Sequence, residues 1–230
     1  MFRIMDKMWK SHGHHLYLTP YLVTATGEEC GMIEVVLNSA TTGEIQRDAG
    51  GSSAVFKKTP LADWLAEKNN VAGSPERLKM AVNNFIASLA GYCVATYVLG
   101  IGDRHNDNIM VQQSGHLFHI DFAHFLGNIM KFAGIKRERA PFVLTPEFAY
   151  VITGQEKPEK SRAFQLFVQL ACVAYNLVRQ NASKFIALFQ MMLSTGIPEL
   201  ATNDDLNYLR EAMDVDMTEE QASKHFEALI

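Results

Sequence analysis

Cysteine is scarce in this chain, whose 230 residues include only Cys30, Cys93 and Cys172. Three scattered cysteines are too few for a disulfide framework or a zinc site. No uninterrupted apolar run approaches the roughly 18 residues of a membrane span, and the first residues lack the pattern of a signal peptide. These absences predict a protein of a reducing, cytosolic compartment.

A strong excess of charge is also missing. Lysine and arginine number 21 against 25 acidic residues, so the net charge is −4. Such a balance excludes a generic binder of nucleic acid or of anionic membranes, and any attraction to anions must come from a local patch. The hydrophobic content of 48% is enough for one large core.

The first part of the chain predicts a short helix followed by two strands. The β-type runs 17–23 and 31–37 flank the turn signal Thr26-Gly27-Glu28, and residues 41–59 read as a loop with a short helix. Ser74-Pro75-Glu76 then predicts a helix start with Ser74 as N-cap. Apolar residues at helical spacing continue this helix to about Leu99, where Gly100 and Gly102 end it.

The second half predicts a hairpin and then helices. Residues 111–113 and 117–121 form two short strands around Ser114-Gly115. Helices are expected near 161–180, 182–195, 203–213 and 218–229, the last with a Thr218–Gln221 capping box. The fold class is therefore α+β, mainly helical with a few strands.

The hairpin region 101–124 carries the chemistry. Asn108 and Asp121 offer oxygen ligands suited to Mg²⁺, and the hairpin brings them together. Each residue alone also fits a bland role, as a turn-capping Asn or an Asp at a strand end. His105 in the polar loop can take a proton from an attacking hydroxyl. Asp103 can orient His105 or accept the proton itself.

The neighbouring polar residues have plainer readings. Arg104 is expected to brace the site, and Asp107 to be a solvated loop acid. His119 is expected in the core. For His124 two readings stay open: it contacts a phosphate group transferred at this site, or it has no role in the chemistry. The histidines of the first polar stretch read as solvated; they are His12, His14 and His15.

The sequence strongly resembles the phosphoinositide 3-kinase and 4-kinase superfamily in two motifs, Asp103-Arg104-His105-x-x-Asn108 and the following His119-Ile120-Asp121-Phe122. The first motif reverses the His-Arg-Asp order that the catalytic loop of ordinary protein kinases has. Further stretches are similar to phosphoinositide 3-kinases of class I or II. They are Ala90 to His105, Ile33 to Val36, Lys136 to Phe142 and Gly196 to Leu200. The resemblance covers nearly the whole chain.

The resemblance implies a protein-kinase-like fold and transfer of the ATP γ-phosphate to the 3-hydroxyl of an inositol lipid at a membrane. It implies ATP and Mg²⁺ as cofactors, with Asn108 and Asp121 as metal ligands. His105 with Asp103 would be the base, and His124 would assist the transferred phosphate. The residues expected to bind the nucleotide are Tyr21, Ile33, Glu34, Val35, Val36, Ser39, Met110, Ile120 and Asp121. Among these, 34–36 would be the hinge that holds adenine.

Residues 121–142 would form the activation loop that reads the lipid headgroup. The residues expected to contact the headgroup phosphates are Lys131, Lys136, Arg137 and Arg139. A solvated basic loop is the alternative. The single lysine in Asn128 to Lys131 and the run Phe132 to Arg137 are similar to class II, whereas Glu34-Val35-Val36 is similar to class I. The preferred lipid stays open.

The resemblance also implies a division of the chain. Residues 1–38 would be the end of the N-lobe and the hinge, and 39–230 the C-lobe, with the catalytic loop at 101–110 and C-terminal helices at 161–230. Family members carry an upstream lobe with a phosphate-binding lysine, so we expect this chain alone to be nearly inactive. A regulatory or adaptor subunit would bind through regions outside it, and the protein would be cytoplasmic and recruited to membranes, without nucleic-acid partners.

Two alternatives stay open. One keeps the fold and changes the substrate, as in a 4-kinase or a protein kinase of the superfamily; the basic Lys136-Arg137-Glu138-Arg139 cluster argues against it. The other is a truncated pseudokinase or scaffold. The missing upstream lobe supports it, and so does Ala123, because family members have glycine there and alanine tolerates fewer backbone angles. It is opposed by the intact Asp103, His105, Asn108 and Asp121.

Overall fold

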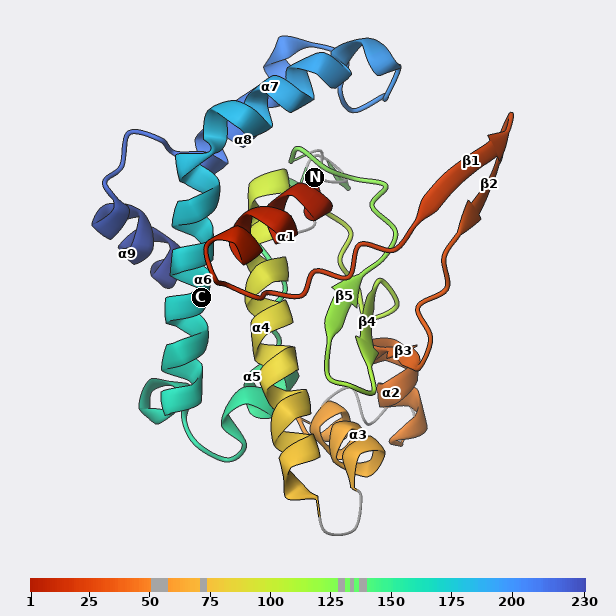
Figure 1. The fold of residues 1–230 in the computed structure, drawn as a ribbon, viewed down its shortest axis with the longest axis vertical. Coiled ribbons are helices and arrows are strands. Elements are labelled where there is room, and N and C mark those ends of the chain that lie inside the picture. Colours follow the sequence, from red (N-terminus) through yellow and green to blue (C-terminus); the bar gives the residue numbers. More distant parts are fainter. Residues whose placement is uncertain (51–57, 71–73, 128–130, 133–134, 137–139) are drawn as a thin grey trace.

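The computed structural model describes residues 1–50, 58–70, 74–127, 131–132, 135–136 and 140–230. Helix α4 (Pro75–Leu99) runs through its centre and packs against α6 (Arg162–Gln180) and the sheet that contains β5 (Leu117–His119) (Figure 1). Its side chains from Ser88 to Thr96 are all buried. By length and composition α4 could cross a membrane, but 67% of its most apolar stretch is buried inside the protein. We therefore read α4 as the core helix.

The ends of α4 follow the sequence signals in part. Gly100 adopts the left-handed conformation (φ 57°) and ends the helix as predicted. Ser74 is the N-cap residue and Pro75 lies in the first turn, as predicted, although the Ser74 side chain makes no capping hydrogen bond to the helix.

The first strand prediction is wrong over residues 17–22. The observed hairpin consists of β1 (Val23–Gly27) and β2 (Cys30–Ile33), which are exposed and extend away from the helices (Figure 1). Upstream of it, Leu16 and Leu18 are buried against Gly91 of α4, and Tyr17 between them has a positive φ of 48°. Packing onto α4 therefore holds this segment out of the ladder.

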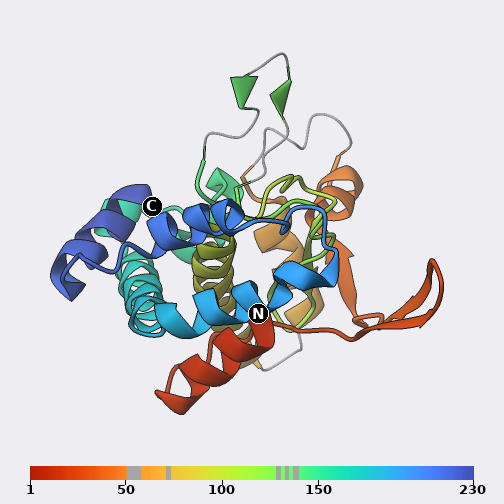
Figure 2. The same cartoon turned by 90° about the horizontal axis from the view of Figure 1, so that it is seen from above.

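A second sheet has the order β3–β4–β5, all antiparallel, and is formed by β3 (Ser39–Thr41), β4 (Ile109–Gln112) and β5. The β4–β5 hairpin is the predicted one, with slightly different bounds. The pair β6 (Lys131–Phe132) and β7 (Ile135–Lys136) stands apart from the rest (Figure 2).

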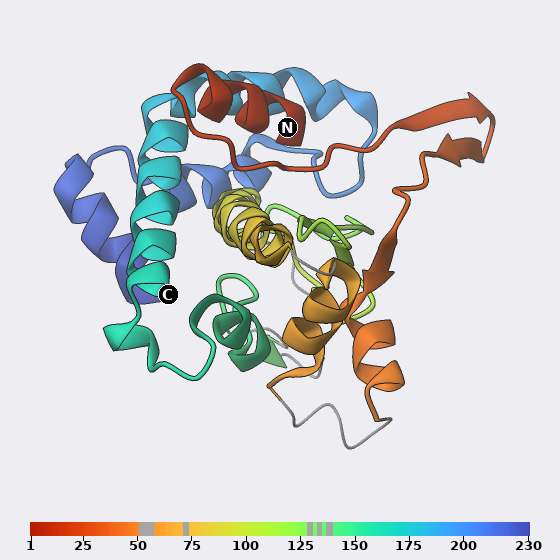
Figure 3. The same ribbon diagram turned by 60° about the horizontal axis from the view of Figure 1, so that its bottom comes forward.

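Helices surround α4 on the sides that the sheet leaves open (Figure 3). Helix α1 (Phe2–Ser11) docks on α6, where the indole N–H of Trp9 donates to the Ala174 carbonyl at 3.0 Å. The other side holds α2 (Thr42–Asp48), α3 (Pro60–Asn69) and α5 (Pro146–Thr153). Helices α3 and α5 were not predicted, although Thr145-Pro146-Glu147 is a helix-start signal and the Thr145 hydroxyl accepts from the Phe148 N–H.

The C-terminal helices were predicted with small errors in their bounds. They are the 3₁₀ turn η2 (Pro158–Lys160), α6, α7 (Ala182–Met192) continued by η3 (Leu193–Thr195), η4 (Asn203–Leu206) leading into α8 (Asn207–Met213), and α9 (Glu219–Leu229). The capping box at the start of α9 is confirmed, because the Gln221 N–H donates to the Thr218 hydroxyl and the Gln221 side chain accepts from the Thr218 N–H.

Candidate functional site

The β4–β5 hairpin places Asn108 and Asp121 at the same end of a rigid ladder. Ile109 pairs with His119, and just beyond this pair the Ile120 N–H donates to the Asn108 carbonyl at 3.0 Å. The other end of the hairpin is fixed to α4, where the Ser88 hydroxyl accepts from the Leu117 N–H at 2.9 Å. The two predicted metal ligands are thus neighbours across strands, as the sequence indicated.

The donor chemistry of this pair fits a hard cation. Asn108 is buried (5% exposed), and its amide nitrogen donates to the Asp103 carbonyl at 2.9 Å. With the amide N–H engaged there, the Asn108 side-chain oxygen is the group left to act as a ligand. Asp121 is an exposed carboxylate with a positive φ of 57°. One buried and one exposed oxygen ligand suit Mg²⁺, which keeps water and phosphate as its remaining ligands.

Arg104 braces the site, as predicted. Its guanidinium donates to the carbonyls of Gly102 (2.8 Å), Ile120 (2.7 Å) and Asp121, and lies 5.5 Å from the centre of the Phe122 ring. These bonds tie the backbone of the catalytic loop to the segment that carries Asp121.

The loop histidine, His105, is exposed and lies close to Asp103. Its Nε2 atom is 4.0 Å from a carboxylate oxygen of Asp103, which is too long for a hydrogen bond. Its Nδ1 accepts from the Asp107 N–H at 3.2 Å, so a neutral ring carries its hydrogen on Nε2. Asp107 also forms an exposed ion pair with Arg47 at 3.1 Å, and is therefore more than a solvated acid.

The second histidine of the site, His124, has a partner that the sequence did not reveal. Its Nδ1 lies 3.3 Å from the carboxylate of Glu199, 75 residues away. Its carbonyl accepts from the Gly102 N–H at 3.0 Å, beside Asp103. The stretch Gly196 to Leu200 was noted as a family-like motif, but nothing in it identified Glu199 as a site residue.

His119 is a core residue, as predicted. It is 3% exposed and stacks on Tyr92 with ring centres 4.7 Å apart. Burial, and then the nearby Arg104 charge, lowers the pKa of His119 to about 3. This ring is therefore neutral at physiological pH and serves packing.

A cavity of about 430 Å³ lies between the hinge segment and the hairpin. Its lining is Tyr21, Ile33, Glu34, Val35, Val36, Met110, Phe118, Ile120 and Asp121. Eight of the nine residues predicted to bind the nucleotide are thus brought together. The exception is Ser39, whose hydroxyl donates to the Val36 carbonyl at 2.7 Å instead. Phe118 was not predicted, although its place two residues before Ile120 on an alternating strand could have indicated it.

Two backbone groups of the segment Ile33 to Val36, whose residues line this cavity, are available for hydrogen bonding. In the described part of the chain, no hydrogen-bond partner is recorded for the Val36 N–H or the Glu34 carbonyl. The Glu34 N–H and carboxylate, by contrast, bond to Leu22, which fixes the segment. A fixed strip with one free donor and one free acceptor can bind a flat heteroaromatic ring.

The predicted headgroup residues are only partly described. Lys131 and Lys136 are paired positions of β6 and β7. Arg137 and Arg139 lie outside the described residues.

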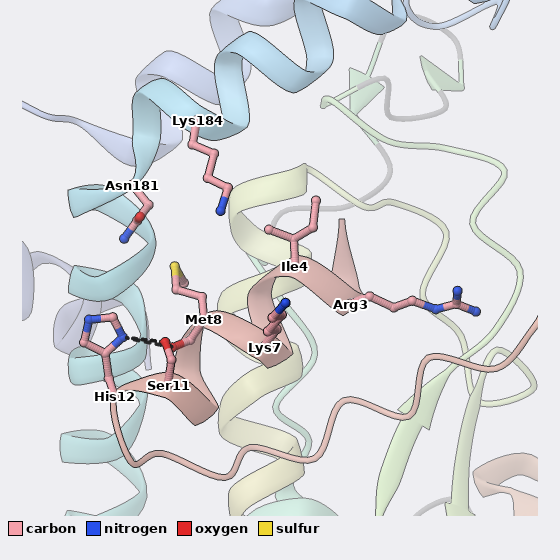
Figure 4. Close-up of a pocket in the computed structure, with 8 residues that line it drawn as sticks. All are labelled: Arg3, Ile4, Lys7, Met8, Ser11, His12, Asn181 and Lys184. Atoms are coloured by element: carbon pink, nitrogen blue, oxygen red, sulfur yellow. Dashed lines mark hydrogen bonds between the residues drawn. The ribbon is translucent and has the colours of Figure 1, made fainter.

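Another cavity, of about 490 Å³, lies between α1 and the start of α7 (Figure 4). Lys184 extends from α7 toward α1, whereas Arg3 points away from it (Figure 4). Because these cations do not converge on one point, the cavity does not form a focused anion site.

Comparison with known proteins decides the family. The model of the family described as phosphatidylinositol 3- and 4-kinase matches residues 1–202. This chain belongs to the phosphatidylinositol 3- and 4-kinase family. The resemblance found in the sequence is thereby confirmed, and so is the fold class, a mainly helical kinase-like C-lobe with a few antiparallel strands.

Similar relatives of this phosphatidylinositol kinase chain are phosphatidylinositol 3-kinases. It is 54% identical over 230 residues to "Phosphatidylinositol 3-kinase 3" of Dictyostelium discoideum, and 55% identical over 231 residues to "Phosphatidylinositol 3-kinase 1" of that organism. It is 49% identical over 230 residues to "Phosphatidylinositol 4-phosphate 3-kinase C2 domain-containing subunit beta" of Homo sapiens. Each match covers all of this chain but only 13% or 14% of the relative.

Proposed function

We propose that this chain is the catalytic C-lobe part of a lipid kinase that transfers the γ-phosphate of ATP to the 3-hydroxyl of phosphatidylinositol or its phosphates. The observation that carries the proposal is the cavity of about 430 Å³, which gathers eight of the nine predicted nucleotide residues with Asp121 at its edge. The names of the relatives support the 3-hydroxyl, and one names phosphatidylinositol 4-phosphate as its substrate.

The nucleotide would enter with adenine against the hinge. The Val36 N–H and the Glu34 carbonyl would bond the ring edge, and Ile33, Met110 and Ile120 would sandwich the ring. The phosphates would then extend toward Asn108 and Asp121, which would hold Mg²⁺. Bound Mg²⁺ would neutralise phosphate charge as the phosphoryl group transfers.

Two groups of the catalytic loop are candidates to take the proton of the lipid hydroxyl. The carboxylate of Asp103 offers free lone pairs. His105 can accept the proton only if its Nδ1 gives up the Asp107 N–H bond, either to take the proton itself or to hold the ring hydrogen and leave Nε2 free, because the neutral ring carries its hydrogen on Nε2. The variants Asp103→Asn and His105→Asn separate these routes: the base is the residue whose loss removes most of the activity.

The remaining assignments belong to the same proposal. Residues 1–38 would end the N-lobe and form the hinge, 39–230 would be the C-lobe, and the activation loop 121–142 would bind the headgroup through Lys131, Lys136, Arg137 and Arg139. The protein would be cytoplasmic, recruited to membranes, and joined there by a regulatory subunit.

The alternative of an inactive scaffold gains no support from Ala123. Ala123 is described, and it is not among the residues with positive φ. An alanine at position 123 therefore needs no backbone angle reserved for glycine.

A vesicle assay with the complete expressed protein tests the proposal. Phosphatidylinositol and phosphatidylinositol 4-phosphate are offered separately with Mg²⁺ and labelled ATP, and the position of the new phosphate is determined. We expect 3-phosphorylated product, a loss of 100-fold or more in Asp121→Asn, and little change in the exposed control Asp63→Asn. Product phosphorylated at another hydroxyl, or no lipid product, would refute the proposal.

A headgroup panel with Lys136→Ala and Arg137→Ala tests the loop assignment. We expect a changed lipid preference with the KM for ATP unchanged. The chain alone should be nearly inactive in the same assay.

A further inference from the structure

Among the predicted catalytic residues in the described part of the chain, His124 has the nearest oppositely charged partner, which is Glu199. Nδ1 of His124 lies 3.3 Å from Oε1 of Glu199, and the two side chains are only 28% and 23% exposed. A pair shielded to this degree holds its geometry better than a surface ion pair does.

The backbone on the His124 side is fixed to the end of α4. The Gly102 N–H donates to the His124 carbonyl (3.0 Å), the Leu126 N–H to Leu99 (2.8 Å) and the Gly127 N–H to Gly100 (3.1 Å). His124 is therefore tied to the start of the predicted catalytic loop, residues 101–110.

The backbone on the Glu199 side is fixed independently. Leu200 is fully buried, and its N–H donates to the Ile197 carbonyl at 3.0 Å. Farther along the chain, Tyr208 donates its hydroxyl to the Tyr97 carbonyl at 2.7 Å. The Tyr208 ring also lies against Gly127, where an added Cβ would be 2.5 Å from a ring carbon. The C-terminal segment thus packs directly against the segment that carries His124.

The bond has a chemical consequence for the ring. A carboxylate only accepts, so Nδ1 of His124 must hold the hydrogen, and Nε2 is left as the atom that can exchange a proton or bond a phosphate oxygen. In the described part of the chain, no partner is recorded for Nε2. His105 has the opposite arrangement, since its Nδ1 accepts from a backbone N–H.

We propose that Glu199 is a positioning residue of the kinase: its carboxylate holds Nδ1–H of His124 and thereby fixes Nε2 as the working atom of that ring. This inference rests on the proposed function and deepens it. Glu199 itself touches neither nucleotide nor lipid in this account, and it acts only through His124.

A double-variant cycle in the complete protein tests this inference by lipid phosphorylation. Glu199→Leu removes the acceptor, Glu199→Gln keeps a neutral one, and His124→Ala removes the ring. We expect kcat to fall about 10-fold in Glu199→Leu and less in Glu199→Gln, with the KM for ATP unchanged within about twofold. We expect Glu199→Leu combined with His124→Ala to be no slower than His124→Ala alone.

The matched control for loss of charge is Asp204→Asn, because Asp204 is an exposed carboxylate five residues after Glu199. This variant should keep the wild-type kcat. Thermal unfolding of each variant accompanies the kinetics, and the partial rescue by glutamine excludes a purely structural loss. If the effects of Glu199→Leu and His124→Ala multiply, or if Glu199→Leu keeps the wild-type kcat, the inference is wrong while the proposed function stands. A wild-type protein that phosphorylates no inositol lipid overturns the proposed function and this inference with it.

Discussion

Alanine at position 115 should damage the hairpin that carries the proposed metal ligands. Gly115 lies in the β4–β5 turn with φ of 92°. A Cβ there would overlap the Ala81 carbonyl oxygen of α4 and lie 2.5 Å from the carbonyl carbon. These atoms belong to the backbone of a buried helix, so they cannot yield and the hairpin must shift.

The expected loss has three parts. Left-handed backbone in a residue with a Cβ costs about 1–2 kcal/mol, and overpacking adds about 1–3 kcal/mol. A shifted hairpin also weakens the Leu117 N–H to Ser88 bond and the Asn84 amide to Ser114 carbonyl bond, both 2.9 Å, at about 1 kcal/mol each. We expect the free energy of unfolding to fall by about 4–7 kcal/mol.

Gly196→Ala is the matched control. Gly196 also has a left-handed conformation (φ 78°, ψ 17°), but no atom lies within 4 Å of an added Cβ. It should lose only the strain of about 1–2 kcal/mol. Denaturant unfolding of both variants measures the difference, provided the slopes agree with the wild type. Equal losses in the two variants would show that the hairpin does not press on α4 as described.

Three further predictions concern polar side chains that hold the fold or the candidate site together. In a urea titration, Arg179→Ala should lower the free energy of unfolding by about 3–5 kcal/mol. The reason is that the guanidinium of Arg179, a residue 7% exposed, donates to the carbonyls of Met213, Asp214 and Met217. Arg210→Ala, on the exposed side of α8, should lower it far less. Burial raises the pKa of Glu147 above its ordinary value of 4.5, so the folded protein binds this proton more tightly than the unfolded chain. The stability of the wild type relative to Glu147→Gln should therefore fall as pH rises from 4.5 through the raised pKa, and a flat difference would contradict it. Arg104→Lys should lower kcat about 10-fold, because lysine lacks the planar fork that binds three carbonyls together; wild-type kcat would show that this brace is dispensable.

Much of the helical framework followed from the sequence, because its causes are local. The spacing of apolar residues over 75–99 and the glycine at position 100 specify α4, and Thr218 with Gln221 caps α9 through neighbouring groups alone. The β4–β5 hairpin was also predictable, since Ser114-Gly115 is a turn signal between two β-type runs, and the pairing of these runs brings Asn108 and Asp121 close together. The segment 17–22 was not predictable, because its burial against Gly91 outweighs its β-type composition.

The sequence by itself determined the family and the chemical groups that a site can use: the order Asp103, Arg104, His105, the side-chain oxygens of Asn108 and Asp121, and the run Ile33 to Val36. Only the tertiary structure decided which groups act on one another. The Glu199–His124 pair spans 75 positions, and the bond from Gln46 to Glu147 spans 101. Ala123 likewise changed its meaning only when its backbone angle was known. Local pattern specifies elements through short-range sterics and hydrogen bonds, whereas the partner of a side chain is set by how distant elements pack.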